Sequence, residues 1–342
     1  LTAAIARDTA VKRALRDDGI EAGSHNAGLL FEPWEIATNE GSPYRVFTPF
    51  WRACLAAPEP PAPERAPALT LPDAWPDGLK IAELGLEPEV DWAGGLQAEW
   101  QPGEHGAGRR LDAFLGGPVG RYGDGRDRPD REGTSRLSPH LHLGEIGPRQ
   151  VWHELRGRGI NADRFLAELG WREFAHHLLY HFPETPLRPL RQEFERLPWR
   201  EDPAGLAAWQ RGRTGYPLVD AGMRQLWETG WMHNRVRMVA ASFLAKDLLI
   251  PWQDGARWFW DTLVDADLAN NTLGWQWTAG CGADAAPFFR IFNPARQAER
   301  FDPEGRYVAR FAPDSAGLDR VVDHGEARGR ALAALQTVSG RD

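Results

Sequence analysis

Apolar residues recur three and four positions apart in two long stretches of this chain, which is the pattern of amphipathic helices. The first stretch covers residues 163–182, and its apolar members are Phe165, Leu166, Leu169, Leu178 and Leu179. The second covers residues 233–249 and is followed by Pro251, which cannot continue a helix. No convincing series of alternating strands appears beyond residue 98, so we predict a mainly α-helical chain.

The front of the chain is organised differently. Residues 1–20 indicate the end of a helix, and residues 27–50 mix short apolar runs with proline and glycine, as in the loops and a late strand of an α/β domain. Residues 58–76 read PEPPAPERAPALTLPDAWP, a proline density that predicts an extended linker. We therefore expect three parts, which are the remnant of an α/β domain (1–57), an interdomain linker (58–97) and an all-helical domain (98–342).

The composition limits the class of protein. No apolar run approaches the roughly 20 residues of a membrane helix, and no signal-like segment is present. These absences lead us to expect a soluble protein. The chain starts at Leu1 rather than methionine, so we expect that it has lost its beginning. The cysteine content favours the reducing cytoplasm as its location. Cys54 and Cys281 alone cannot form a disulfide framework, an iron–sulfur site or a structural zinc site.

The charge and the tryptophan content bear on possible ligands. The formal net charge of −8 argues at first against nucleic acid. However, residues 1–97 hold 8 Lys and Arg against 15 Asp and Glu, whereas the remainder holds 32 against 33. The helical part is thus nearly neutral and could gather its arginines on one face. The 16 tryptophans either belong to a large aromatic core or, for some of them, stack on a planar cofactor or on bases.

Two polar groupings are weak signals by themselves. Glu168 and Arg172 lie at i and i+4 on a predicted helix beside Trp171, but a surface ion pair is the better explanation from this helix alone. The string GTSRLSPHL (residues 133–141) places hydroxyl side chains around Arg136 ahead of a helical segment. That arrangement is typical of a phosphate cradle.

Two further groupings leave more than one interpretation open. Residues 231–238 place Asn234 and two arginines at a helix start, where they suit a phosphate or a carboxylate. Asp265 and Asp267 suggest metal binding or acid–base chemistry, or else an aspartate buried against an arginine such as Arg237. Adjacent histidines on a helix face apart, so we expect no metal site.

Four long strings, in this order, resemble the photolyase/cryptochrome family. They are RYGDGRDRPDREGTSRLSPHL (121–141), FLAELGWREFAHHL (165–178), TGYPLVDAGMRQLWETGWMHNRVRMVAASFLAKDLL (214–249) and DADLANNTLGWQWTAGCGADAAPFFRIFNP (265–294). The resemblance extends from the first residues to about Phe311. It implies a class I photolyase of cyclobutane pyrimidine dimers, with a helical FAD-binding domain that follows the remnant of a Rossmann-like α/β domain.

The resemblance also implies a set of FAD-binding residues. By motif position they are Tyr122, Arg126, Thr134, Ser135, Arg136, Leu137, Ser138, Phe165, Glu168, Arg172, Trp231, Asn234, Arg237, Asp265, Asp267 and Asn271. Arg237 would pair with Asp265 against the flavin ring, and Asn271 would face flavin N5. An amide at that position fits an enzyme that uses fully reduced flavin, whereas plant cryptochromes tend to have aspartate there and insect ones cysteine.

The family's lesion-binding residues carry over in the same way. A stacked dimer cannot reach a buried flavin, so such an enzyme flips it out of the duplex. The matching positions here are Glu168, Trp171, Asn234, Arg235, Met238 and Trp277. The two tryptophans would clamp the dimer, and Glu168 would bond to its edge. Photolyases of the (6-4) type place a histidine pair in this neighbourhood, whereas this chain reads His233–Asn234, which favours the cyclobutane lesion.

Trp275, Trp252 and Trp199 match the family's tryptophan chain, which relays an electron from the surface to the flavin. Together with Glu168 and Asn271 they form the predicted catalytic set. The expected partner is damaged DNA, the expected state is a monomer, and a folate or deazaflavin antenna is possible in the full-length protein. Two alternatives remain, which are a cryptochrome-type photoreceptor without repair activity and a DNA-binding relic without FAD.

Overall fold

The described part of the chain is helical throughout. The computed structural model describes residues 2–68, 70–75, 77–86, 89–158, 162–285 and 289–339, and within them it contains no strand. Its α-helices are α1 (Thr2–Asp17), α2 (Phe47–Ala56), α3 (Gly94–Glu99), α4 (Glu104–Leu115), α5 (Tyr122–Gly125), α6 (Ser138–Leu143), α7 (Pro148–Gly157), α8 (Asp163–His181), α9 (Pro203–Gln210), α10 (Pro217–Thr229), α11 (Asn234–Ser242), α12 (Trp252–Thr262), α13 (Leu268–Ala279), α14 (Pro294–Phe301), α15 (Arg306–Phe311) and α16 (His324–Ser339). The mainly α prediction is confirmed.

Shorter helical turns connect these elements. They are η1 (Ile81–Leu84), η2 (Pro118–Arg121), η3 (Gln192–Arg196), η4 (Phe243–Asp247) and η5 (Ser315–Gly317). The helix predicted over residues 163–182 is α8, within one residue at its end. The helix predicted over 233–249 is in fact two pieces, because α11 passes into the π-helical turn η4 and the chain then reverses at Leu249, whose φ is +58°.

The late strand predicted within residues 27–50 was wrong. A strand needs a neighbouring strand to pair its backbone groups, and side chains of α8 take that role here. The N–H groups of Leu30 and Phe31 donate to the Glu173 carboxylate at 2.9 and 3.2 Å. The N–H of Tyr44 donates to His177 Nε2 at 3.1 Å. Loop backbone is thus satisfied by a helix, and no sheet is required.

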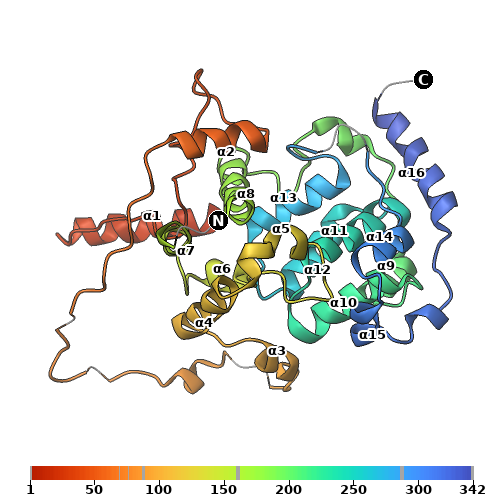
Figure 1. Ribbon diagram of the computed structural model, residues 1–342. Coiled ribbons are helices and arrows are strands. Elements are labelled where there is room, and N and C mark those ends of the chain that lie inside the picture. Colours follow the sequence, from red (N-terminus) through yellow and green to blue (C-terminus); the bar gives the residue numbers. More distant parts are fainter. Residues whose placement is uncertain are drawn as a thin grey trace.

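The predicted linker runs outside the body of the molecule. In Figure 1 it leaves α2 and follows one side of the molecule to α3. It is held near its start, where Trp152 Nε1 on α7 donates to Glu59 Oε1 at 3.1 Å. Leu69, Pro76, Glu87 and Pro88 lie outside the described residues, as does Leu1. The predicted boundary after residue 97 falls inside α3.

Two groups of helices carry most of the core. A front group, α4 to α8, packs around Leu111, Phe114, Trp152 and Phe165. A rear group, α9 to α13 together with η4, forms a larger core that also receives α15 and α16. Helix α8 packs against α13 of the rear group and against α2. We call the contact between the front and rear groups the seam.

Local sequence fixes several helix starts in these groups. Asp202 caps α9 by accepting from the Gly205 N–H at 2.8 Å, and Asp267 caps α13 by accepting from the Asn270 N–H at 2.8 Å. Pro148 opens α7, where its missing N–H costs nothing. Among the described residues no helix combines the length and apolar character that crossing a bilayer requires.

Glu173 should make stability depend on pH. Burial raises the pKa of this carboxyl from 4.5 to about 7, although Arg172 and the two N–H donors oppose the shift. The folded protein therefore binds the proton more tightly than the unfolded chain, so Glu173 stabilises it fully below about pH 4.5, and this stabilisation is lost as the pH rises through about 7. Relative to wild type, Glu173→Gln should become more stable by roughly 2–3 kcal/mol across that range.

Urea unfolding followed by circular dichroism at pH 5 and pH 8 measures this difference. Glu184→Gln is the matched control, because Glu184 is exposed and follows the same helix. A stability difference between Glu173→Gln and wild type that stays constant with pH would contradict the assignment.

Candidate active site

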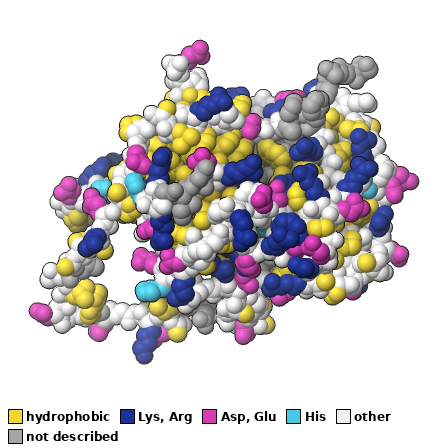
Figure 2. Space-filling view, in the orientation of Figure 1, with side chains coloured by type: hydrophobic (Ala, Val, Ile, Leu, Met, Phe, Trp, Pro, Cys, Tyr) yellow, Lys and Arg dark blue, Asp and Glu magenta, His cyan; other side chains and the backbone are white. Residues whose placement is uncertain are grey.

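The sequence-predicted residues come from both sides of the seam. The front group contributes the segment 122–138 and one side of α8, and the rear group contributes residues 231–238 and 265–277. Figure 2 shows Lys and Arg side chains gathered near the middle of one face of the molecule, with acidic side chains among them. The contacts that follow show how these charges are arranged.

Glu168 on α8 forms an ion pair with Arg126, which follows α5. The guanidinium carbon of Arg126 also lies 5.5 Å from the Tyr122 ring centroid, and Tyr122 packs edge-on against Phe165 at 5.3 Å. Burial raises the pKa of Glu168, with Arg126 acting in the opposite direction. The structure thus joins four predicted residues, which are Tyr122, Arg126, Phe165 and Glu168.

Arg136 lies at the seam between two indole rings. Its guanidinium carbon is 4.5 Å from the centroid of Trp231 and 5.5 Å from that of Trp100, and its Nη1 pairs with the Glu99 carboxylate. Nearby, Trp231 Nε1 donates to Ser138 Oγ at 3.4 Å. Of the other residues in this string, Leu137 is buried, Thr134 and Ser135 are half-buried, and Ser138 is exposed.

Arg237 and Asp265 form the ion pair that the motif positions implied. Arg237 Nη2 lies 2.8 Å from Asp265 Oδ2, and Arg237 Nε donates to the carbonyl of Met232 at 2.7 Å. The Asp265 carboxylate is almost fully buried. Arg237 also lies over Trp231, at 5.9 Å from its centroid. This pair therefore continues the cluster that Arg136 begins.

Two residues of α11 have different surroundings. Asn234, the first residue of the helix, is exposed. Arg235 pairs across the seam with Asp127 at 2.8 Å and approaches Met238 Sδ at 3.7 Å. The half-buried guanidinium of Arg235 thus already has a carboxylate partner within the chain.

Asp267 also bridges the seam. Besides capping α13, its Oδ2 lies 3.7 Å from His142 Nδ1 and 3.4 Å from His176 Nε2. Burial alone would raise the pKa of Asp267, but hydrogen bonds from the two histidines lower it well below its ordinary range. Asp267 is therefore a carboxylate at neutral pH. One helical turn further, Asn271 Nδ2 donates to the carbonyl of Ala256 at 2.9 Å.

The two tryptophans predicted to clamp the lesion are Trp171 and Trp277, and a supporting ring contact is present for Trp171. One face of Trp171 is covered by Phe47, whose ring lies 3.8 Å away and nearly parallel. Trp277 on α13 is half-buried. The guanidinium of Arg172 lies against the N-terminal part of the chain, where its Nη1 donates to the carbonyl of Gly28 at 2.6 Å. Its assignment to the cofactor stays a prediction.

The three tryptophans of the predicted electron chain belong to the core of the rear group. Trp275 and Trp252 are each 2% exposed, whereas Trp199 is half-buried at the edge of the same cluster. Trp275 packs edge-on against Phe259 at 5.0 Å and against Trp209 at 6.1 Å. Its Nε1 is buried, and no described residue accepts a hydrogen bond from it.

Sequence reasoning missed several residues of this cluster. Glu99, Trp100 and Asp127 each contact a predicted arginine, but they follow no helical periodicity that would have singled them out.

His233 was noted only as a neighbour of Asn234. It is 3% exposed and its Nδ1 accepts from the Arg235 N–H, so its Nε2 carries the proton in the neutral form. Burial lowers the pKa of His233 to about 3, which keeps it neutral.

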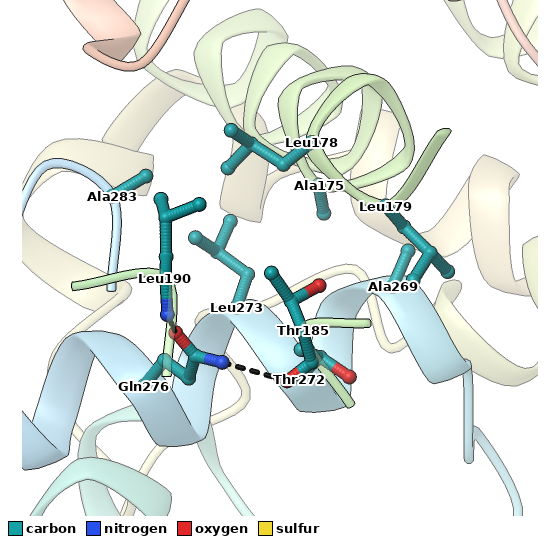
Figure 3. A pocket seen from close by; sticks show the side chains of 10 residues that line it. All are labelled: Ala175, Leu178, Leu179, Thr185, Leu190, Ala269, Thr272, Leu273, Gln276 and Ala283. Carbon is teal, nitrogen blue, oxygen red and sulfur yellow. Dashed lines mark hydrogen bonds between the residues drawn. The ribbon is translucent and has the colours of Figure 1, made fainter. Parts of the chain in front are cut away.

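A separate apolar pocket lies between α8 and α13. Figure 3 shows its lining, where Gln276 Nε2 donates to the Thr185 carbonyl at 2.6 Å. Its volume is about 20 Å³, close to the space of one water molecule, and it contains none of the predicted site residues. Within the described ranges, no three His, Cys, Asp or Glu side chains are grouped as metal ligands would be.

Comparisons with known proteins bear on the family to which this chain belongs. Residues 165–327 match the family described as the FAD binding domain of DNA photolyase, and residues 1–68 match the family described as DNA photolyase. A deoxyribodipyrimidine photo-lyase of Agrobacterium fabrum is 48% identical over 98% of this chain and 77% of its own length. Cryptochrome-1 of Arabidopsis thaliana is 39% identical over 92% of this chain and 48% of its own length.

A solved structure gives the same result in three dimensions. The crystal structure of a bacterial class III photolyase from Agrobacterium tumefaciens is 48% identical and superposes with a TM-score of 0.92. The match covers 98% of this chain and 77% of that one. The order of the motifs, the helices that carry them and these relatives lead to one conclusion: the chain belongs to the photolyase/cryptochrome family.

Proposed function

We propose that this chain is a deoxyribodipyrimidine photo-lyase, which uses light and reduced FAD to split cyclobutane pyrimidine dimers in DNA. The observation that supports it most is the cluster at the seam. There, Arg136 of the front group and Arg237 of the rear group lie over the Trp231 ring, and each is paired with a carboxylate. The chain is 48% identical to a photolyase over nearly its full length. The proposed partner is damaged DNA bound by a monomer.

The side chains at the seam fit FAD. Arg136 Nε and His233 Nε2 are buried donors with no hydrogen-bond acceptor among the described residues. Both side chains lie beside Trp231, with the Arg136 guanidinium at 4.5 Å and the His233 ring at 6.1 Å. A buried donor without an acceptor costs about 1–3 kcal/mol. The phosphate, ribityl and ring oxygens of a flavin dinucleotide would supply such acceptors.

The holding residues are those that the motifs implied. We propose that Tyr122, Arg126, Thr134, Ser135, Arg136, Leu137 and Ser138 hold the phosphate and ribityl part, and that Trp231, Arg237, Asp265, Asp267 and Asn271 contact the remainder. The Arg237–Asp265 pair, at 2.8 Å, holds both charges in fixed positions. When bound in its reduced form and excited by light, FAD would donate one electron to the dimer and would recover it after the two bonds between the bases have opened.

The chain's own residues would then bind and orient the lesion. Glu168 is suited to the edge of a pyrimidine, because burial raises its pKa and Arg126 fixes its position. Trp171, with Phe47 behind one face, offers a supported ring for stacking against a flipped base. We propose Trp277 as the opposing ring and Arg235 as a phosphate contact, for which it would exchange its partner Asp127.

We next consider to which class of photolyases this chain belongs. The sequence motifs led to the expectation of class I. The Agrobacterium tumefaciens structure, at 48% identity and a TM-score of 0.92, is described as class III. That likeness supports class III for this chain. A photolyase structure from the archaeon Sulfolobus tokodaii, at 28% identity, is described as containing two FAD molecules, with the implication of a novel light-harvesting cofactor.

A cryptochrome-type photoreceptor is the second candidate, favoured by the 39% identity to Arabidopsis Cryptochrome-1. The two functions differ in one measurable respect. A photolyase turns over a dimer-containing oligonucleotide in the light, whereas a photoreceptor only changes the state of its flavin. Asn271, Glu168 and Trp171 together favour repair.

Light-dependent repair tests the proposal directly. The FAD-bound protein, chemically reduced, is incubated with an oligothymidylate that contains one cyclobutane dimer, in blue light and in darkness. We expect restoration of intact thymines, read by chromatography, in the light only. Repair in darkness, or no repair by the FAD-loaded protein under blue light, would falsify the assignment.

Trp275→Phe separates electron supply from repair. If Trp275 relays electrons to the flavin, light-driven reduction of the oxidised cofactor should be nearly abolished in this variant, because phenylalanine is much harder to oxidise. The same variant, reduced chemically beforehand, should repair dimers at close to the wild-type rate. Flavin absorbance during illumination measures the first effect, and the repair assay measures the second.

Trp260→Phe is the matched control, because Trp260 is 50% exposed on α12, the helix that also carries Trp252. Wild-type photoreduction in Trp275→Phe would remove this residue from the relay.

A further inference from the structure

Arg136 belongs to a cluster of cations and indole rings. Trp231 and Trp100 lie at 4.5 and 5.5 Å from its guanidinium carbon. Arg110 on α4 also lies over Trp100, at 5.1 Å. Cation–π contacts of this kind gain strength as they are desolvated, and only 11% of the Arg136 side chain is exposed. Two aromatic residues therefore confine the guanidinium of Arg136.

Glu99 fixes the edge of the same guanidinium. Its carboxylate pairs with Arg136 Nη1 and lies 3.6 Å from Arg110 Nη2, which also donates to the Glu99 carbonyl at 3.0 Å. Trp100 is anchored independently, because its Nε1 donates to the carbonyl of Thr229 at 2.7 Å. The pair Glu99–Trp100 is thus fixed by α4 and by the end of α10.

The backbone at Arg136 makes this support necessary. Its φ is +52°, in the left-handed region that non-glycine residues adopt at a cost of about 1 kcal/mol or more. Such a conformation persists only when surrounding contacts over-determine it. What these contacts leave open is Arg136 Nε, which is buried and has no acceptor among the described residues.

We propose that Glu99 and Trp100 are positioning residues of the FAD site, which hold Arg136 so that its Nε–H is presented to the cofactor. This inference rests on the proposed function, and it adds residues from the end of α3, where the predicted linker meets the helical domain. Neither residue belongs to the set that the family motifs implied. Displacement of α3 would therefore reach the cofactor through Arg136.

A simpler role for Glu99 predicts the opposite result. If Glu99 only neutralised Arg136, its removal would leave more positive charge near an anionic dinucleotide, and FAD would bind more tightly. If Glu99 positions Arg136, its removal frees the guanidinium to rotate, and FAD binds more weakly. The sign of the change in affinity decides between these roles.

The test compares Glu99→Gln, Trp100→Phe and Trp100→Leu in the full chain. FAD release from the loaded protein is followed by flavin fluorescence, and FAD affinity by titration of the apoprotein. Glu99→Gln and Trp100→Leu should release FAD on the order of 10-fold faster. Trp100→Phe keeps an aromatic face and should show a smaller effect. Glu104→Gln, at an exposed glutamate of neighbouring α4, should match wild type.

A double-mutant cycle makes the test specific to positioning. In an Arg136→Ala background, Glu99→Gln should no longer change FAD release, because the group that it positions is gone. Equal effects in both backgrounds, or tighter FAD binding by Glu99→Gln, would overturn the inference. If Trp100→Leu does not fold by circular dichroism, Glu99→Gln and Trp100→Phe still decide it. Failure of wild type to bind FAD would instead count against the proposed function.

Discussion

The contact between the two helix groups depends on ion pairs whose members come from opposite sides of the seam. Where α8 meets α13 near Ala175 and Ala269, the contact is apolar and close. Elsewhere along the seam, Arg235 meets Asp127, and Asp267 meets two histidines. These side chains are partly buried, so a charge left there without a partner would lose hydration and gain nothing in return. The two groups therefore hold each other in a defined register, while polar surface between them remains for a ligand.

This pairing also explains how an acidic chain can serve a polyanionic partner. The formal net charge is −8, but acidic residues at the seam are paired with arginines rather than facing outward as a uniform field. Each arginine that contacts a carboxylate is held in place before any ligand arrives. Preorganised donors lose less conformational freedom on binding than flexible ones. Local arrangement, rather than total charge, decides what such a face can bind.

The sequence predicted the helices and part of the site for physical reasons that can be named. Apolar periodicity defined α8 closely, because apolar residues recur along its whole length, and in its second half the helix is buried on most of its sides. The Arg237–Asp265 pair followed from motif position and is present at 2.8 Å. Periodicity could not distinguish the π-helical turn at Phe243–Asp247 from an α-helix, because all five residues are buried and no exposed position marks the change in turn length. Glu99 and Trp100 could not be found, since only tertiary contacts bring them to Arg136.

Helix α8 makes polar contacts on two of its sides. Glu168 pairs with Arg126 inside the front group, whereas Glu173, five residues later, accepts hydrogen bonds from the backbone N–H groups of Leu30 and Phe31, near the start of the chain. An α-helix turns by about 100° per residue. A one-residue insertion or deletion between these glutamates would therefore swing one of them out of place whenever the other is kept. The spacing of five is therefore a constraint that couples the Glu168–Arg126 pair to the docking of the loop at Leu30 and Phe31, so neither contact can change independently of the other.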